Sequence, residues 1–282
     1  MRWSSLLLAM SLHVAGLGLA SCGVTVEPLN RPNLLISPDE LPPKTDIITN
    51  RPHLNLIPRA VQTEQAARAM SDQLEDYRRA GYSVMDSGPD QRYLRLQTIF
   101  DIVHKSSHMA AEPLRVILIE RPVFQAYTKG GLDVIFYTGL TERLTDDELA
   151  LVAGHEIAHI AAGHNAEKGS RDIVNTDSYG QTAALAAFYS IDAEVEADRV
   201  GLVYAALAGY DIRAASGLWD KLIQYAGDSH FNLFTDTHPS HATRSEMLSI
   251  YSQELSSALA TIQTQDEKDA FLRCNPLYCA AK

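Results

Sequence analysis

The sequence has little positive charge, few cysteines and, beyond its first 22 residues, no long hydrophobic run. Its 24 Lys and Arg stand against 35 Asp and Glu, which gives a formal net charge of −11 over 282 residues. This shortage of basic side chains argues against nucleic acid as a partner and against a polybasic membrane patch. The longest internal apolar candidate, TAALAAFYSI at residues 182–191, is too short to span a bilayer, which argues against a multispanning membrane protein.

The first 22 residues follow the pattern of a secretory signal, with one basic residue, an apolar run and small residues at its end. The last four, LASC, resemble the bacterial lipoprotein box. We expect residues 1–21 to be removed and Cys22 to carry acyl chains that anchor the protein in a membrane. The alternative is a plain signal peptide with an incidental cysteine. Gly23 rather than aspartate follows, and by analogy with enterobacterial sorting this favours the periplasmic side of the outer membrane.

The two remaining cysteines, Cys274 and Cys279, lie close together in CNPLYC. The cell envelope is oxidising and Asn-Pro favours a turn, so we expect a disulfide between them; two free thiols are the alternative. Closing so short a loop contributes roughly 2 kcal/mol at most, which makes this bond a local staple.

Proline is concentrated near the N-terminus, where seven of the twelve prolines fall within residues 23–58. This density blocks helices and most sheet pairing. We therefore interpret residues 22–58 as a lipidated, semi-extended tether, parts of which lie along the domain surface. The folded domain is predicted to cover residues 59–282.

Hydrophobic patterns in this domain predict helices before and after a short β-sheet region. Residues 61–81 and 92–109 have helical patterns, and residues 114–120, 123–129 and 133–139 are β-branched and aromatic runs. We expect a small antiparallel sheet, with residues 123–128 at its edge as the site where a peptide adds as a strand. Thr145-Asp-Asp-Glu then forms a capping box, and a helix begins.

That helix carries the stretch AGHEIAHIAAGH, residues 153–164. His155 and His159 are four apart, so they point the same way from successive helical turns and can bind one zinc ion. Glu156 lies beside the metal, where it can take a proton from a water that zinc has acidified. His164 lies five residues after His159, about 140° around an ideal helix, so we expect it to face away as a structural or exposed residue.

The third ligand is predicted in IDAEVEADRVG, residues 191–201, where Glu194 and Asp198 are again four apart on a helical stretch. Glu194 can ligate the metal, while Asp198 accepts a hydrogen bond from a ligand imidazole and fixes its tautomer. Glu196 points elsewhere and is the less favoured ligand. The alternative interpretation, a solvated acidic face, is outweighed by the coupling to the upstream histidines.

Three ordered motifs, GGLDVIFYTGLTERLTDDELALVAGHEIAHIAAGH, EVEADRVG and THPSHATR, resemble the gluzincin zinc metallopeptidases related to HtpX and the CAAX prenyl endopeptidase. The small lipid-anchored periplasmic members of the LoiP, YcaL and BepA type are most similar. The resemblance implies a mainly helical α+β zincin-like fold with a small antiparallel sheet packed on the active-site helix. It also implies one Zn²⁺ per chain on His155, His159 and Glu194, with Glu156 as general base.

The resemblance further assigns Asp198 to a ligand histidine and matches His238 and Arg244 to an active-site histidine and the arginine that follows it. His238 has two possible roles, donating to the oxyanion or moving onto the open zinc position. Residues 165–181 are polar and could form a lid.

Two functions remain open. The first is an endopeptidase acting on unfolded or misassembled envelope polypeptides. The second is a non-proteolytic envelope chaperone or assembly lipoprotein that keeps zinc for structure. The presence of Glu156 favours the first, since a structural site does not need it.

Overall fold

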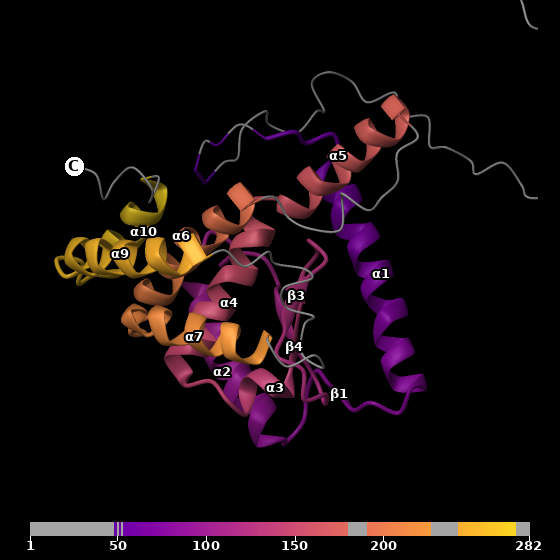
Figure 1. Cartoon of the computed structure of the whole chain (residues 1–282), viewed down its shortest axis with the longest axis horizontal. Helices are drawn as coiled ribbons and strands as arrows, with labels where there is room; N and C mark the ends of the chain where they lie inside the picture. The colour runs from indigo at the N-terminus through magenta and orange to yellow at the C-terminus, as the bar shows by residue number, and fades with distance from the viewer. Residues whose placement is uncertain (1–47, 50, 52, 180–190, 227–241, 275–282) are drawn as a thin grey trace, which may run out of the picture. The chain divides into compact units, whose positions relative to one another are not determined.

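The computed structural model describes residues 48–49, 51, 53–179, 191–226 and 242–274, all of which lie in one compact unit, residues 37–282. A four-stranded sheet stands between a long helix on one side and a group of helices on the other (Figure 1). The domain is therefore a mainly helical α+β fold, as the sequence predicts.

The sheet consists of β1 (Val84–Met85), β2 (Arg115–Ile119), β3 (Ala126–Thr128) and β4 (Asp133–Tyr137), in the order β1-β2-β4-β3. β3 and β4 form the expected antiparallel hairpin, but β2 and β4 run parallel. The prediction of an antiparallel sheet was therefore wrong in its central pair. After β2 the chain crosses to the far edge before it turns back, so β4 fills the place between them.

Both faces of the sheet are buried, which explains the nearly continuous apolar runs of β2 and β4. One face packs against Met70 and Leu74 of α1 (Arg59–Arg79). The other face belongs to the main hydrophobic core, together with α2 (Gln91–Lys105) and α4 (Asp146–Ala161). The sheet residues divide by the two-residue period of a strand: Ile117, Ile119, Ile135 and Tyr137 toward α1, and Val116, Leu118, Val134 and Phe136 toward the core.

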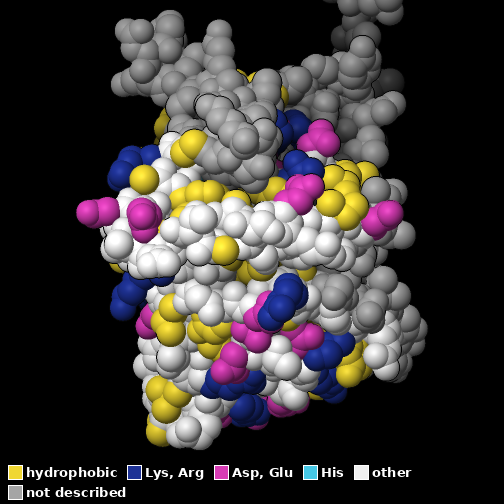
Figure 2. Space-filling view, turned by 90° about the vertical axis from the view of Figure 1, so that its left-hand side faces the viewer, with side chains coloured by type: hydrophobic (Ala, Val, Ile, Leu, Met, Phe, Trp, Pro, Cys, Tyr) yellow, Lys and Arg dark blue, Asp and Glu magenta, His cyan; other side chains and the backbone are white. Residues whose placement is uncertain are grey.

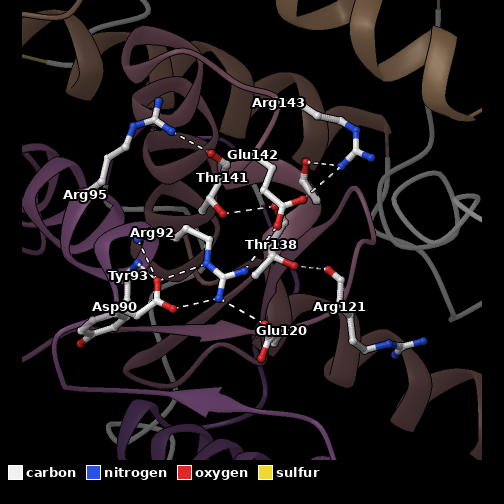
Figure 3. A network of polar contacts seen from close by, with 11 residues as sticks. Asp90, Arg92, Tyr93, Arg95, Glu120, Arg121, Thr138, Thr141, Glu142 and Arg143 are labelled. Carbon is white, nitrogen blue, oxygen red and sulfur yellow. Dashed lines mark hydrogen bonds and ion pairs between the residues drawn. The ribbon is translucent and has the colours of Figure 1, made fainter.

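A network of ion pairs joins α2 to the start of α4, through the short helix α3 (Thr138–Thr141) (Figure 3). Arg95 of α2 donates to the carbonyls of Thr141 and Leu144 and pairs with Asp146, the first residue of α4. Since these carbonyls lie at the end of α3 and just before the N-cap of α4, Arg95 holds the N-terminus of α4 in place.

The start of α4 is the predicted capping box. The Thr145 hydroxyl accepts from the Glu148 backbone N–H, and the Glu148 carboxylate accepts from the backbone N–H of Thr145. Lys221 of α7 (Ala215–Ala226) donates to the same carboxylate at 2.7 Å. Every residue from Glu148 to Ile160 is buried, so α4 is the central helix of the domain.

Two glycines bring α4 against α6 (Ile191–Leu207). A Cβ atom at Gly154 would lie 2.4 Å from the carbonyl oxygen of Gly201, and one at Gly201 would lie 2.6 Å from the backbone nitrogen of His155. Side chains at either position would push the helices apart. The close approach places the first turn of α6 beside the histidines of α4.

Four further helical elements are described: α5 (His164–Tyr179), η3 (Ile212–Ala214), α9 (Ala242–Leu259) and α10 (Gln265–Arg273). The segment that we expected as a lid is thus helical through Tyr179. Within the described ranges, no helix has both the length and the apolar character needed to cross a membrane.

Candidate metal centre and active site

His155 and His159 of α4 and Glu194 of α6 form a buried cluster with a potential ligand atom from each residue. The two histidine Nε2 atoms are 2.9 Å apart, and they lie 3.5 and 3.4 Å from the carboxylate oxygens of Glu194. Ligands about 2.0–2.1 Å from a tetrahedral Zn²⁺ are roughly 3.3 Å from one another, so these spacings fit such an ion. Two histidines and a glutamate are also a donor set of catalytic zinc sites.

Local geometry explains why these residues meet. His155 and His159 occupy successive turns on one side of α4, and Glu194 lies in the first turn of α6, which the glycine contact holds against α4. Two of the three ligands thus depend on helix periodicity alone. The third depends on the packing of two helices.

Asp198 and Arg244 support the His155 side of the cluster. His155 Nδ1 lies 3.0 Å from an Asp198 carboxylate oxygen, and Arg244 of α9 donates to both oxygens of Asp198 at 2.7 and 2.9 Å. Arg244 also lies 3.0 Å from Glu194. Burial alone would raise the pKa of Asp198, but Arg244 and His155 outweigh it and lower that pKa. Asp198 therefore stays ionised and can hold the Nδ1 proton of His155.

His164 lies on the opposite side of the cluster, against His159. Its Nδ1 is 2.8 Å from Nδ1 of His159, and both side chains are buried. The expectation that His164 faces away was wrong, because it extended an ideal helix past its end. α4 ends at Ala161, and Gly163 takes a φ of 72°, so the chain turns and α5 begins with His164 under His159.

Glu156 lies next to His155 on α4 and is fully buried. An ionised carboxylate is costly to bury unless charge or hydrogen bonding compensates it, and a bound cation in the adjacent cluster supplies such charge. The position suits a group that takes a proton beside the metal. Glu196, in contrast, lies behind His164, which is 3.2 Å away, and not among the metal ligands.

The sheet edge nearest α4 is β3, as expected for residues 123–128. The Tyr137 backbone N–H donates to the Gln125 carbonyl, so Gln125 and, two residues on, Tyr127 direct their backbone groups toward β4. Ala126 and Thr128 direct theirs outward, and Asn165 of α5 donates to the Thr128 carbonyl. Outward N–H groups thus come from Ala126 and Thr128, and not from Gln125 or Tyr127.

Several predicted residues lie outside the described residues: Cys22, His238 and Cys279. Cys274, at the end of α10, is disulfide-bonded, and its partner also lies outside them. The sequence did not predict the contact of His164 with His159, or those of Arg51 with Glu196 and Glu167. The polar character of GHNAEKG just after the helix was the only local signal for His164.

A cluster of potential metal ligands between two helices, with a small sheet beside the first of them, is the arrangement of a zincin-like α+β domain. The family model described as peptidase family M48 matches residues 90–179 and 174–251, which together cover more than half of the chain. The chain belongs to peptidase family M48.

The chain is similar to several proteins that are named as metallopeptidases. The mitochondrial metalloendopeptidase OMA1 of Arabidopsis thaliana is 32% identical over 161 residues, which is 51% of this chain and 32% of that protein. Human OMA1 is 29% identical over 161 residues, 46% of this chain and 31% of that protein. The metalloprotease YcaL of Escherichia coli is 28% identical over 130 residues, 39% of this chain and 51% of that protein. The chain thus spans about a third of the length of the OMA1 proteins.

Proposed function

We propose that this protein is a zinc-dependent endopeptidase that binds one Zn²⁺ through His155, His159 and Glu194. The observation that carries the proposal is the cluster of these three side chains with a buried carboxylate, Glu156, directly beside it. A structural zinc site closes all four positions with protein ligands, whereas three ligands leave one position open. The names of the relatives, metalloendopeptidase and metalloprotease, support the same activity.

Zinc in such a site polarises the scissile carbonyl and lowers the pKa of water to near 7. The protein supplies the other steps. Glu156 accepts the proton of the attacking water and delivers it to the leaving amine. Asp198 and Arg244 hold His155 and balance the charge of the carboxylates around it. His238, which the family resemblance places at the active site, is proposed either to donate to the oxyanion or to cap the metal.

The proposed substrates are unfolded or misassembled polypeptides, bound as an added strand along β3. The N–H of Ala126 points away from β4, as main-chain pairing with an added strand requires, and such pairing depends little on the substrate side chains. Ala126 is fully buried in this structure, so a substrate strand would have to displace what covers it. A substrate peptide with single N-methyl groups tests this arrangement. Methylation at alternate residues should raise KM, whereas methylation at the residues between them should not, since strand pairing has a period of two. A uniform response along the peptide would contradict strand addition.

The proposed location is the periplasmic side of the bacterial envelope, with Cys22 as the lipid anchor. It is argued from the first 22 residues and not from the relatives, some of which are mitochondrial by name. Metabolic labelling with a palmitate analogue should mark the wild type and leave Cys22→Ser unlabelled. Equal labelling of both proteins would remove the anchor from Cys22.

The test of the activity is Glu156→Gln, measured on an unfolded protein such as reduced and alkylated α-lactalbumin. The variant should fold and keep its zinc, while kcat for cleavage falls by about 10²–10⁴-fold, the usual contribution of a general base. Glu64→Gln, on the exposed face of α1, is the matched control. Zinc binding with equal cleavage by wild type and Glu156→Gln would overturn the mechanism. Zinc binding with no cleavage by the wild type would favour the non-proteolytic chaperone.

A further inference from the structure

The second nitrogen of His159 leads into a buried chain of hydrogen bonds that the proposed mechanism does not use. His159 Nδ1 lies 2.8 Å from His164 Nδ1. If His159 binds a metal through Nε2, its Nδ1 carries the ring proton and donates it. His164 Nδ1 is then the acceptor, which determines the tautomer of His164.

The other nitrogen of His164 must therefore carry its proton. His164 Nε2 lies 3.2 Å from Oε2 of Glu196, which is buried on α6. Along the path from His159 through His164 to Glu196, an acceptor thus faces each donor, and the two hydrogen bonds run in the same direction.

Glu196 also receives contacts from the segment that precedes α1. The Thr49 hydroxyl and the Arg51 Nε both donate to its carboxylate, across 147 and 145 residues of sequence. The guanidinium of Arg51 also donates to both oxygens of Glu167 on α5, at 3.2 and 2.7 Å. Arg51 thereby links α5 to α6 through Glu167 and Glu196. Ile48, three residues earlier in the chain, packs in the main hydrophobic core.

The two histidines of the cluster are supported in parallel but from different parts of the chain. Asp198 and Arg244 hold His155 from α6 and α9. His164 and Glu196 hold His159, and Arg51 closes that second path. We propose that His164, Glu196 and Arg51 are positioning residues for His159, so that the segment before the first helix completes the metal centre. The inference rests on the proposed binding of zinc to that centre.

Arg51→Met in the full-length protein tests the proposal, with Arg171→Met as its matched control. Arg171 also pairs with Glu167, as Arg51 does, but it makes this pair from within α5 and not from the segment before α1. Zinc affinity is measured by competition with a chromogenic chelator. Arg51→Met should lower the affinity about 10–100-fold, the usual effect of losing a group that orients a metal ligand, and Arg171→Met should leave it unchanged.

A second pair of variants tests the middle of the chain. His164→Phe removes the acceptor for His159, while His164→Asn keeps an oxygen near the position of Nδ1. We expect His164→Phe to lose affinity by the same 10–100-fold and His164→Asn to recover part of it. The visible spectrum of the Co²⁺-loaded proteins reports the ligand geometry independently of peptide cleavage, and it should change in His164→Phe and Arg51→Met.

The outcomes separate this inference from the proposed function. If the wild type binds no zinc, the proposed function is overturned, and this inference with it. If the wild type binds zinc but Arg51→Met binds it as tightly as Arg171→Met does, the role of Arg51 is overturned. Equal affinities of His164→Phe and His164→Asn would overturn the role of His164, and this comparison still holds if Arg51→Met does not fold.

Discussion

At the candidate metal centre, the guanidinium of Arg244 balances the carboxylates of Glu194 and Asp198. Glu194 and Asp198 are four apart on α6, so two carboxylates lie on one side of the helix, that of Glu194 fully buried and that of Asp198 9% exposed. Arg244, only 2% exposed, contacts both of them. Burial alone would lower the pKa of Arg244, but the charges and hydrogen bonds of Asp198 and Glu194 raise it. Removing one partner from such a group leaves an uncompensated buried charge, which is strongly destabilising.

Asp198→Asn tests this balance at the scale of one residue. The amide keeps the size of the side chain but loses the charge that holds the proton of His155, so zinc affinity should fall roughly 10–100-fold. Chelator competition measures the change. Asp192→Asn, at an exposed position in the first turn of the same helix, should bind zinc as the wild type does. Equal affinities of the two variants would remove Asp198 from the metal centre.

Among the elements, the contact between α4 and α6 is the one on which the metal centre depends. The contact requires Gly154 and Gly201, because a Cβ atom at either would meet the backbone of the opposite helix at 2.4–2.6 Å. Backbone cannot move aside as a flexible side chain can. Any separation of the helices carries Glu194 away from the histidines of α4.

Gly201→Ala should therefore reduce both stability and zinc affinity. Overpacking costs about 1–3 kcal/mol of unfolding free energy, which urea titration of the metal-free protein measures. Gly217→Ala in α7 is the matched control, since its Cβ would only meet a Glu148 oxygen at 3.7 Å. Replacing this helical glycine should raise stability by up to ~1 kcal/mol. A Gly201→Ala protein as stable as the wild type would show that the helices can separate at no cost.

The start of α2 provides a prediction for pH. The Asp90 carboxylate pairs with the Arg92 guanidinium and accepts from the backbone N–H groups of Arg92 and Tyr93, which lowers the pKa of Asp90 from 3.8 to about 2. Because the folded-state pKa is below the unfolded value, this stabilisation is complete above about pH 4 and is lost as pH falls toward 2.

Asp90→Asn retains an N-cap residue but not the charge. The stability difference between wild type and Asp90→Asn should therefore shrink as pH falls from about 4 to about 2, as measured by thermal unfolding at several pH values. Asp86→Asn, on the exposed loop nearby, is the control. A difference that stays constant across this pH range would contradict the charged cap.

At the scale of the molecular surface, the face that carries α9 and α10 has charges of both signs and no patch of one sign (Figure 2). The face on the side of α9 and α10 shows Lys and Arg interspersed with Asp and Glu, among uncharged and hydrophobic side chains (Figure 2). The formal net charge of −11 thus does not arise from one acidic surface on this face. The predictions that nucleic acid is not a partner and that Cys22 provides the membrane contact remain predictions.

A metal held by α4 and α6 should also stabilise the molecule as a whole. A ligand at 1,000 times its Kd adds about 4 kcal/mol to the unfolding free energy, and each kcal/mol shifts Tm by about 2–4 °C in a domain of 150–250 residues. Chelation should therefore lower the Tm of the wild type and leave that of Glu194→Ala nearly unchanged. A wild-type Tm that does not respond to chelator would show that no metal links the two helices.

Much of the candidate site could be predicted because its logic is local. His155 and His159 share one side of α4 by helix periodicity, and so do Glu194 and Asp198 on α6. The capping box at Thr145 and the hairpin of β3 and β4 also follow from short stretches of sequence. These features need only neighbouring residues, whereas the meeting of Glu194 with the two histidines also depends on the packing of α6 against α4.

Only the tertiary structure decided which distant segments meet. The parallel pairing of β2 with β4 depends on where the chain crosses, which local pattern does not encode. His164 reaches His159 because α4 ends before Gly163 and the chain turns there, so angles counted along an ideal helix no longer apply. The contact of Arg51 with Glu196 joins residues 145 apart. The sequence did not predict this ion pair, because it depends on the packing of the segment before α1 against α5 and α6. Each of these segments alone has the polar pattern of an exposed surface.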